Sequence, residues 1–128
     1  MPRKSPCLVL LLLVYRVSFG RKVGISSSRR KALSHWCVFH RRYCQQVVKT
    51  WDCEFRTAPC ERRISLLYLA NDIMQNTRKE TNGGYITEFM RVIPDALNEV
   101  FNNGDGPGRV AVKRLIRLLS VYWNGVPA

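Results

Sequence analysis

One segment constrains the fold of this chain more than any other. Between Ile64 and Asn76, apolar residues point in nearly every direction around a predicted helix. These residues are Leu66, Leu67, Leu69, Ala70, Ile73 and Met74. A helix that is apolar on most sides is stable in water only when other elements surround it. The sequence therefore predicts an all-α bundle with this helix at its centre.

The same helix carries one polar band. At 100° per residue, four polar side chains fall on a narrow strip of the helix. The band consists of Tyr68, Asn71, Asp72 and Gln75. A buried polar group without a partner costs about 1–3 kcal/mol. The band is therefore expected either to form an internal hydrogen-bond network or to line a wet groove that accepts a ligand, and the pattern leaves both interpretations open.

Two helices are predicted before the central one. The first places apolar and aromatic residues at spacings of three and four, at Leu33, Trp36, Cys37, His40 and Cys44. The second continues this spacing at Val47, Val48, Trp51 and Phe55. Periodicity does not decide whether a break separates them near 41–44. Pro59 presets the start of the central helix, because proline suits a first helical turn.

Two further helices are predicted after the central one. The first has an amphipathic face made of Ile86, Phe89, Met90, Ile93, Leu97, Val100 and Phe101. Pro94 is expected to kink or split it. The last helix is expected to begin near Arg109, with Val112, Leu115, Ile116 and Leu119 on one face. Its other face carries Lys113, Arg114 and Arg117, called the cationic strip below.

Charge and cysteine usage narrow the classes of partner. The chain has 21 Lys and Arg against 9 Asp and Glu, a net charge of +12 that favours nucleic acid, phosphoprotein or anionic membrane. Arg29 and Arg30 belong to a Ser-rich polar stretch that we interpret as flexible and solvated. Five cysteines without a C-x-x-C pair argue against a complete disulfide framework, and we interpret them as reduced thiols.

The first twenty residues resemble a secretory signal peptide. Arg3 and Lys4 precede an apolar run at 7–14, and small residues follow at Ser18 and Gly20. The run is too short to span a bilayer. The odd cysteine count and the absence of an Asn-x-Ser/Thr site argue against export. This local signal leaves the secretory pathway open as an alternative location.

Several stretches resemble the CTD-interacting domain (CID) family of pre-mRNA regulation and transcription-termination factors. They are LSHWCVFHRR at 33–42, VVKTWDCEF at 47–55, LLYLANDIMQN at 66–76, EFMRVIPDAL at 88–97 and the KRL around Arg114. The resemblance covers about 32–119, and the stretch at 66–76 is the most specific. It implies a right-handed superhelical bundle of the VHS/ENTH-like type. It also implies a groove for the heptad-repeat tail of RNA polymerase II.

The resemblance assigns roles to individual residues. Asp72 would accept a hydrogen bond from the heptad tyrosine, and Tyr68, Asn71 and Gln75 would contact the peptide around it. Arg114, with Lys113 beside it, would bind phosphate on the second-position serine, as guanidinium groups do well. The implied partner is the phosphorylated polymerase tail, acting in termination and 3′-end processing in the nucleus.

Both ends of the chain depart from the family pattern. We therefore expect an atypical apolar and basic segment at 1–30, a partial CID at 31–123 and a tail at 124–128, so that the bundle is incomplete at both ends. Catalysis is not expected, because the sequence has no Gly-rich phosphate loop, nucleophile elbow or H-E-x-x-H pair.

The remaining expectations concern ligands and alternative functions. We expect no cofactor, no small-molecule substrate, no membrane partner and no metal. Cys37, His40 and Cys44 share a helical face, but their spacing is more typical of core packing than of a zinc site. The alternatives are a basic helical protein that binds RNA and a small secreted basic protein.

Overall fold

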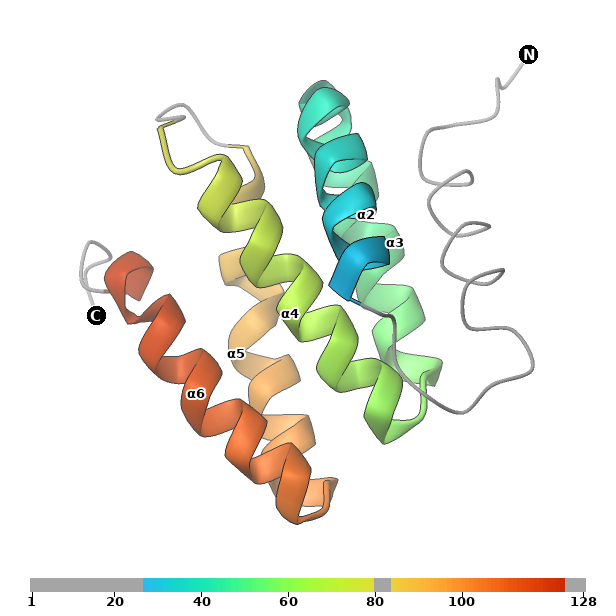
Figure 1. The fold of residues 1–128 in the computed structure, drawn as a ribbon, viewed down its shortest axis with the longest axis vertical. Helices are drawn as coiled ribbons and strands as arrows, with labels where there is room; N and C mark the ends of the chain where they lie inside the picture. Colours follow the sequence, from blue (N-terminus) through green and yellow to red (C-terminus); the bar gives the residue numbers. More distant parts are fainter. Residues whose placement is uncertain (1–26, 80–83, 124–128) are drawn as a thin grey trace.

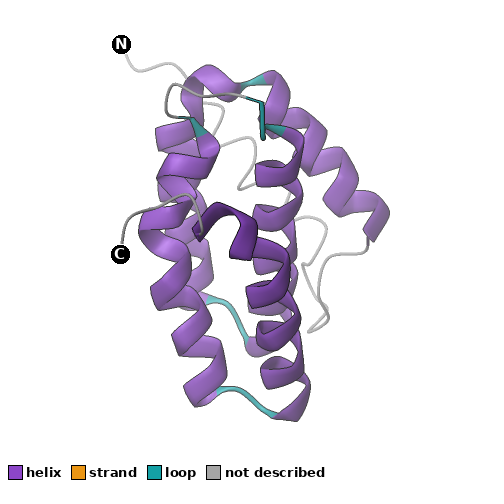
Figure 2. Ribbon diagram, turned by 90° about the vertical axis from the view of Figure 1, so that its left-hand side faces the viewer, coloured by secondary structure: helices purple, strands orange, loops and turns teal. Residues whose placement is uncertain are grey.

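The computed structural model describes residues 27–79 and 84–123, which form helices joined by short connections (Figures 1 and 2). No strand occurs among these described residues, and the all-α prediction is confirmed. The predicted signal-peptide segment lies outside them. The elements are α2 (Ser27–Phe39), the 3-10 turn η1 (Arg41–Tyr43), α3 (Cys44–Thr57), α4 (Cys60–Asn76), α5 (Tyr85–Asn103) and α6 (Gly106–Trp123).

The helices form two layers. Helices α2, α4 and α6 lie side by side and run in the same direction, and α3 and α5 lie behind them (Figure 1). We call the exposed side of α2, α4 and α6 the front face. Helix α4 contacts α2 on one side, α6 on the other and α5 behind. This arrangement makes α4 the central helix, as the sequence predicts.

The burial of α4 follows from its composition. Four of its large aliphatic side chains, Leu66, Leu67, Leu69 and Ile73, are at most 1% exposed. Each buried side chain of this size contributes about 1.5–3 kcal/mol through removal of apolar surface from water. The neighbours of α4 supply that burial because it is contacted from three sides.

Two polar contacts fix the packing of the aromatic core. The indole Nε1 of Trp51 on α3 donates to the carbonyl of Leu66 on α4 at 2.8 Å, and its ring meets Phe89 of α5 edge-on. The Tyr85 hydroxyl of α5 donates to the carbonyl of Cys37 on α2 at 2.6 Å. Aromatic residues thus tie the back layer to the front layer, and the polar donors of Trp51 and Tyr85 are both paired.

The helix boundaries correct two predictions. Helix α5 continues through Pro94, so the expected split does not occur. Ile93, Ala96 and Leu97, on both sides of the proline, are buried in one core. Helix α6 begins at Gly106 rather than near Arg109, because Asp105 Oδ1 accepts the Gly108 N–H at 2.9 Å as a helix cap.

Three side chains differ from their predicted environments. Helix α2 begins at Ser27, so Arg30 lies in a helix and not in a flexible stretch. Ile116 is 47% exposed, because the buried stripe of α6 runs through Val112, Leu115 and Leu119 and leaves it at the edge. Phe101 is 38% exposed and lies under the guanidinium of Arg109.

Candidate functional site

The structure places the predicted polar band on the front face of α4. Asn71 is buried, Tyr68 and Asp72 are half-buried, and Gln75 is exposed. The Gln75 side-chain amide donates to Asn71 Oδ1 at 3.1 Å, which satisfies the buried amide oxygen. Burial therefore decreases across the band, from a structural asparagine to a solvent-exposed glutamine.

Helix α2 closes one side of this band with an arginine. The Nε of Arg30 lies 3.6 Å from Asp72 Oδ2, and its guanidinium carbon lies 5.3 Å from the centroid of the Tyr68 ring. Such a position combines an ion pair with a cation–π contact. The carboxylate that the resemblance assigns to a ligand tyrosine is thus already paired with a cation of the same chain.

Sequence reasoning missed Arg30 because it lies among serines and basic residues. Its spacing carries the missing signal: Arg30 precedes Leu33 by three residues, Ser34 by four and Cys37 by seven, which places it on their helical face. All three of those residues are buried. A helix that begins one turn before Leu33 places Arg30 on its core-facing side.

A second polar contact joins α2 and α4. The Asn76 side-chain amide donates to the hydroxyl of Ser34 at 3.0 Å. In helical projection Asn76 and Asn71 lie on opposite sides of Asp72. Because Asn76 marks the α2 side of α4, Asn71 lies on the side toward α6. The polar band therefore crosses the front face of α4 from one neighbouring helix to the other.

The contacts and the exposure of the band are compatible with both interpretations. Asn71 with Gln75, and Asp72 with Arg30, form internal contacts, as a structural network does. The side chain of Asp72 nevertheless remains 32% exposed, and Tyr68 is only partly buried. A carboxylate with unused acceptor positions and an accessible aromatic ring leave room for a ligand that donates a hydroxyl.

The cationic strip on α6 is fully accessible. Lys113, Arg114 and Arg117 are all exposed, and none of them pairs with an acid among residues 27–79 and 84–123. The predicted phosphate-binding residues are therefore available to a ligand. Unpaired surface cations of this kind attract phosphate without first breaking an internal ion pair.

The orientation of α6 decides which cation is nearest to α4. Arg109 donates to the carbonyl of Phe101 and so marks the flank of α6 that faces α5. Tyr122 is half-buried against the hydrophobic core, where burial raises its pKa and the charge of Arg78, just after α4, opposes that rise. In helical projection Arg114 lies on the flank opposite Arg109. Arg114 therefore lies on the flank of α6 that is turned toward α4 and its polar band.

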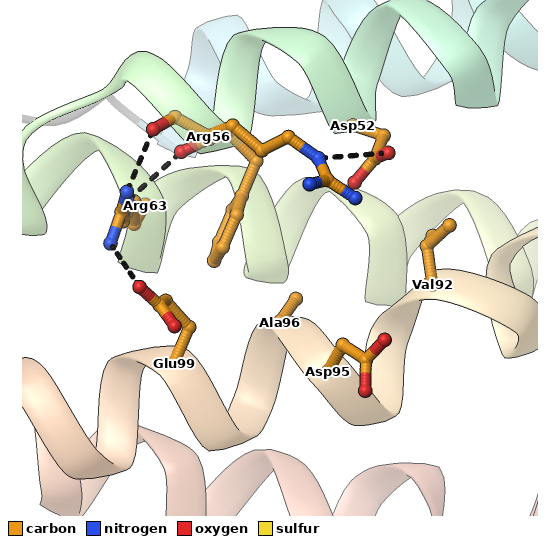
Figure 3. Close-up of a pocket in the computed structure, with 8 residues that line it drawn as sticks. Asp52, Arg56, Arg63, Val92, Asp95, Ala96 and Glu99 are labelled. Carbon is orange, nitrogen blue, oxygen red and sulfur yellow. Dashed lines mark hydrogen bonds and ion pairs between the residues drawn. The ribbon is translucent and has the colours of Figure 1, made fainter.

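A cavity of about 340 Å³ lies elsewhere, between α3 and α5 (Figure 3). Its two arginines are held within the chain: Arg56 pairs with Asp52 at 3.2 Å, and Arg63 with Glu99 at 3.9 Å. None of the predicted site residues lines it. Its lining consists of Asp52, Phe55, Arg56, Arg63, Val92, Asp95, Ala96 and Glu99.

Across the described ranges 27–79 and 84–123, no three His, Cys, Asp or Glu side chains are grouped as a metal site requires. Within the same ranges, no helix combines the length and the apolar content needed to cross a bilayer.

Comparison with known proteins decides the family. The profile of the CID domain matches residues 19–121, which is most of the chain. The chain belongs to the CID domain family. This confirms the resemblance found in the sequence. The matched region contains every described helix up to Val121, so the polar band and the cationic strip both lie within the CID domain.

Curated relatives of this CID domain carry a common name. Regulation of nuclear pre-mRNA domain-containing protein 1B of Homo sapiens is 32% identical over 88 residues, which are 69% of this chain and 27% of that protein. Regulation of nuclear pre-mRNA domain-containing protein 1A of Gallus gallus is 34% identical over 101 residues, which are 75% of this chain and 37% of that protein. The chain thus spans less than two fifths of the length of either relative.

Proposed function

We propose that this CID domain binds the phosphorylated heptad-repeat tail of RNA polymerase II through its front face. The observation that carries the proposal is the placement of a partly exposed carboxylate, Asp72, and an unpaired guanidinium, Arg114, on the same face. The heptad Tyr-Ser-Pro-Thr-Ser-Pro-Ser offers a hydroxyl and a phosphate one residue apart. The face provides an acceptor for the first and a cation for the second.

The tyrosine of the repeat is assigned to the polar band. Asp72 accepts its hydroxyl hydrogen, and the half-buried Tyr68 ring provides an apolar wall beside it. Asn71 and Gln75 lie next to this site and offer amide groups to the peptide backbone. The partial exposure of Asp72 supports this assignment, because a fully buried carboxylate would be inaccessible.

The phosphate of the second-position serine is assigned to Arg114, with Lys113 beside it. A phosphoserine carries about −1.5 to −2 charges near neutral pH, and a guanidinium binds it through two parallel hydrogen bonds. The exposure of both cations means that this contact forms at the surface and is screened by salt. Affinity for one repeat should therefore be modest, and adjacent repeats raise it by multivalency.

The cellular role follows from the same proposal. The printed names of the relatives refer to nuclear pre-mRNA. We propose that this chain acts in the nucleus, in transcription termination and 3′-end processing, as a binding module without catalytic activity. The polymerase tail is then its partner, and no cofactor takes part.

The test measures affinity for a two-repeat peptide with and without phosphate on the second-position serine. We expect the phosphorylated peptide to bind about tenfold more tightly, as charge-assisted hydrogen bonds allow. Arg114→Ala should remove this preference, and Asp72→Asn should weaken both peptides alike. Equal affinity of the original chain for both peptides would contradict the proposal.

Arg117→Ala is the matched control. It removes the same charge one helical turn away, and it should leave the phosphate preference intact. A loss of preference in Arg117→Ala, with Arg114→Ala unaffected, would move the phosphate site to the outer part of the cationic strip and refute the assignment to Arg114.

RNA remains the second candidate because of the net charge of +12. Binding to phosphate backbones depends steeply on salt. If the front face binds RNA, a generic single-stranded RNA should displace the phosphopeptide, and its affinity should fall strongly between 50 and 200 mM salt. The tail-binding proposal predicts no displacement.

A further inference from the structure

The positive charge of the chain is concentrated in its first 51 residues. Residues 1–51 contain 11 of the 21 Lys and Arg and none of the nine Asp and Glu, whereas residues 52–128 contain ten and nine. Almost the whole net charge of +12 therefore belongs to 1–51. In the described part of this stretch, 27–51, the cations lie on α2, η1 and the first turns of α3. Cations without acids among them attract polyanions.

The corner between α2 and α3 combines such cations with exposed aromatic rings. Phe39, the last residue of α2, is 82% exposed, and Tyr43 of η1 is 37% exposed. Arg41 and Arg42 lie between them in the sequence, and both are exposed. A cavity of about 630 Å³ opens at this corner, at the upper end of α2 in Figure 1. It is lined by His35, Val38, Phe39, Arg41 and Arg42.

Backbone hydrogen bonds and ring contacts stabilise the corner. The His40 N–H donates to the carbonyl of Trp36 at 3.1 Å, and the Tyr43 N–H donates to the carbonyl of His40 at 2.9 Å. The His40 ring lies 4.3 Å from the Trp36 ring and meets the Phe39 ring edge-on at 5.1 Å between centroids. The turn that carries the two arginines is thus already formed, which lowers the entropic cost of binding a ligand there.

This corner is distinct from the front face. Phe39 follows Arg30 by nine residues, so at 100° per residue the two side chains point to opposite sides of α2. Arg30 faces Asp72 of the polar band. None of the residues assigned to the heptad peptide lines the corner cavity. A ligand bound at the corner therefore leaves the front face accessible.

We propose that the corner binds single-stranded nucleic acid, with one base stacked on Phe39 and neighbouring phosphates bound by Arg41 and Arg42. The inference goes beyond the proposed function, because neither the polymerase tail nor an RNA that competes for the front face uses this surface. Unpaired bases stack on exposed aromatic rings whatever their sequence, and guanidinium groups bind phosphate. Arg42 forms no ion pair with an acid within 27–79 and 84–123, so it is available to a phosphate.

Other polyanions fit the corner less well. A phosphopeptide offers phosphate to the arginines, but it offers Phe39 no planar base. Membrane-surface sites present several apolar side chains along one helix face. Of the apolar residues that line the cavity, Phe39 is exposed, whereas Val38 is half-buried. One exposed ring beside two arginines is the combination that a stacked base and its phosphates require.

The test measures the affinity of the full chain for a labelled oligouridine of about ten nucleotides, a length that one binding surface covers. Phe39→Ala should weaken binding about tenfold, because stacking is lost, and Phe39→Trp should retain the affinity. The same titration with oligothymidine distinguishes RNA from DNA as the source of the strand. Equal oligouridine affinity of Phe39→Ala and the original chain would overturn the proposal.

Two controls separate stacking from general attraction. Duplex RNA of the same length has no unpaired base, so Phe39→Ala should bind it as the original chain does. Phe101→Ala removes an exposed ring from α5 and should leave oligouridine binding unchanged. A loss of duplex binding in Phe39→Ala, or an equal loss of oligouridine binding in Phe101→Ala, would contradict a stacking site at Phe39.

Arg42→Ala tests the phosphate contact. Each phosphate bound on a single strand contributes about 0.7 to the slope of the logarithm of affinity against the logarithm of salt concentration. Arg42→Ala should lower the slope by about this amount. Arg117→Ala removes an equally exposed charge from α6 and should leave the slope nearly unchanged. Equal changes in both variants would show attraction by net charge alone and refute the corner site.

Two further ligands separate this inference from the proposed function and from membrane binding. A saturating two-repeat phosphopeptide should leave oligouridine bound, and Phe39→Ala should bind that peptide as tightly as the original chain. Displacement of oligouridine by the peptide would place the nucleic acid on the front face and overturn the inference. Oligouridine binding that depends on Phe39, in a chain that does not bind the peptide, would refute the proposed function alone. Vesicles of phosphatidylserine and phosphatidylcholine should bind the original chain and Phe39→Ala alike, and a loss in Phe39→Ala would assign the corner to membranes.

Discussion

The arginines at the start of α4 and those of α6 show two uses of the same side chain. Arg62 pairs with Glu54 at 3.1 Å, and both side chains are largely buried, at 12% and 9% exposure. Arg63 donates to the carbonyls of Phe55 and Arg56. Arg114, by contrast, is exposed and pairs with no acid of the described residues. In this comparison, Arg62 and Arg63 have acceptors within the chain, whereas Arg114 pairs with none of the described acids.

The largest effect is expected at the buried pair. Glu54→Ala removes the carboxylate that pairs with Arg62 in a largely buried site, so we expect the free energy of unfolding to fall by about 3 kcal/mol. Urea unfolding followed by circular dichroism measures this change. A drop below about 1 kcal/mol would show that the pair behaves as a surface ion pair.

A smaller effect is expected at Arg63. Arg63→Ala leaves the carbonyls of Phe55 and Arg56, at the end of α3, without their guanidinium donors, and this should lower the free energy of unfolding by about 1–2 kcal/mol. The same urea experiment applies. Lys49→Ala on α3 is the control, because Lys49 is exposed, and it should change stability by less than about 0.5 kcal/mol.

Tyr122 provides a pH-dependent test at the edge of α6. Burial raises its pKa above the ordinary value, so the folded chain disfavours the phenolate. This contribution to stability is fully present below the unfolded pKa of about 10 and is lost as pH rises through the folded pKa. We expect Tyr122→Phe to reduce the loss of stability between pH 9 and 11. An identical decline in both proteins would show that Tyr122 does not contribute.

The smallest effect on stability is expected at Arg114. Arg114→Ala should change the free energy of unfolding by less than about 0.5 kcal/mol, because no acceptor of the described residues depends on it. Urea unfolding of this variant, beside its peptide affinity, completes the comparison. A substantial destabilisation would place Arg114 with Arg62 and Arg63 among the cations that hold the fold.

The prediction of the fold succeeded where apolar residues at the helical period carried the signal. Leu66, Leu67 and Leu69 point in different directions around one helix, and that pattern requires burial whatever the neighbours are. The outcome at Pro94 was different. Local geometry favours a break there, but burial of the residues on both sides outweighed it.

The prediction of the site was incomplete for a related reason. The polar band was visible because its four residues belong to one helix. The guanidinium that faces it was not, because Arg30 and Asp72 are 42 positions apart and periodicity compares only near neighbours. The cavity between α3 and α5 was missed likewise, since it is formed by residues of three helices.

The sequence by itself determined which helix lies at the centre, most of the side chains that form the core and which polar residues share one strip of the central helix. These properties depend on spacings within a turn or two of helix and on the transfer of apolar surface from water. Only the tertiary structure decided that Arg30 pairs with Asp72 and that Arg62 pairs with Glu54. It also decided that Arg114 lies on the flank of α6 toward the polar band of α4. Ion pairs depend on distances between helices, and packing sets those distances after the helices have formed.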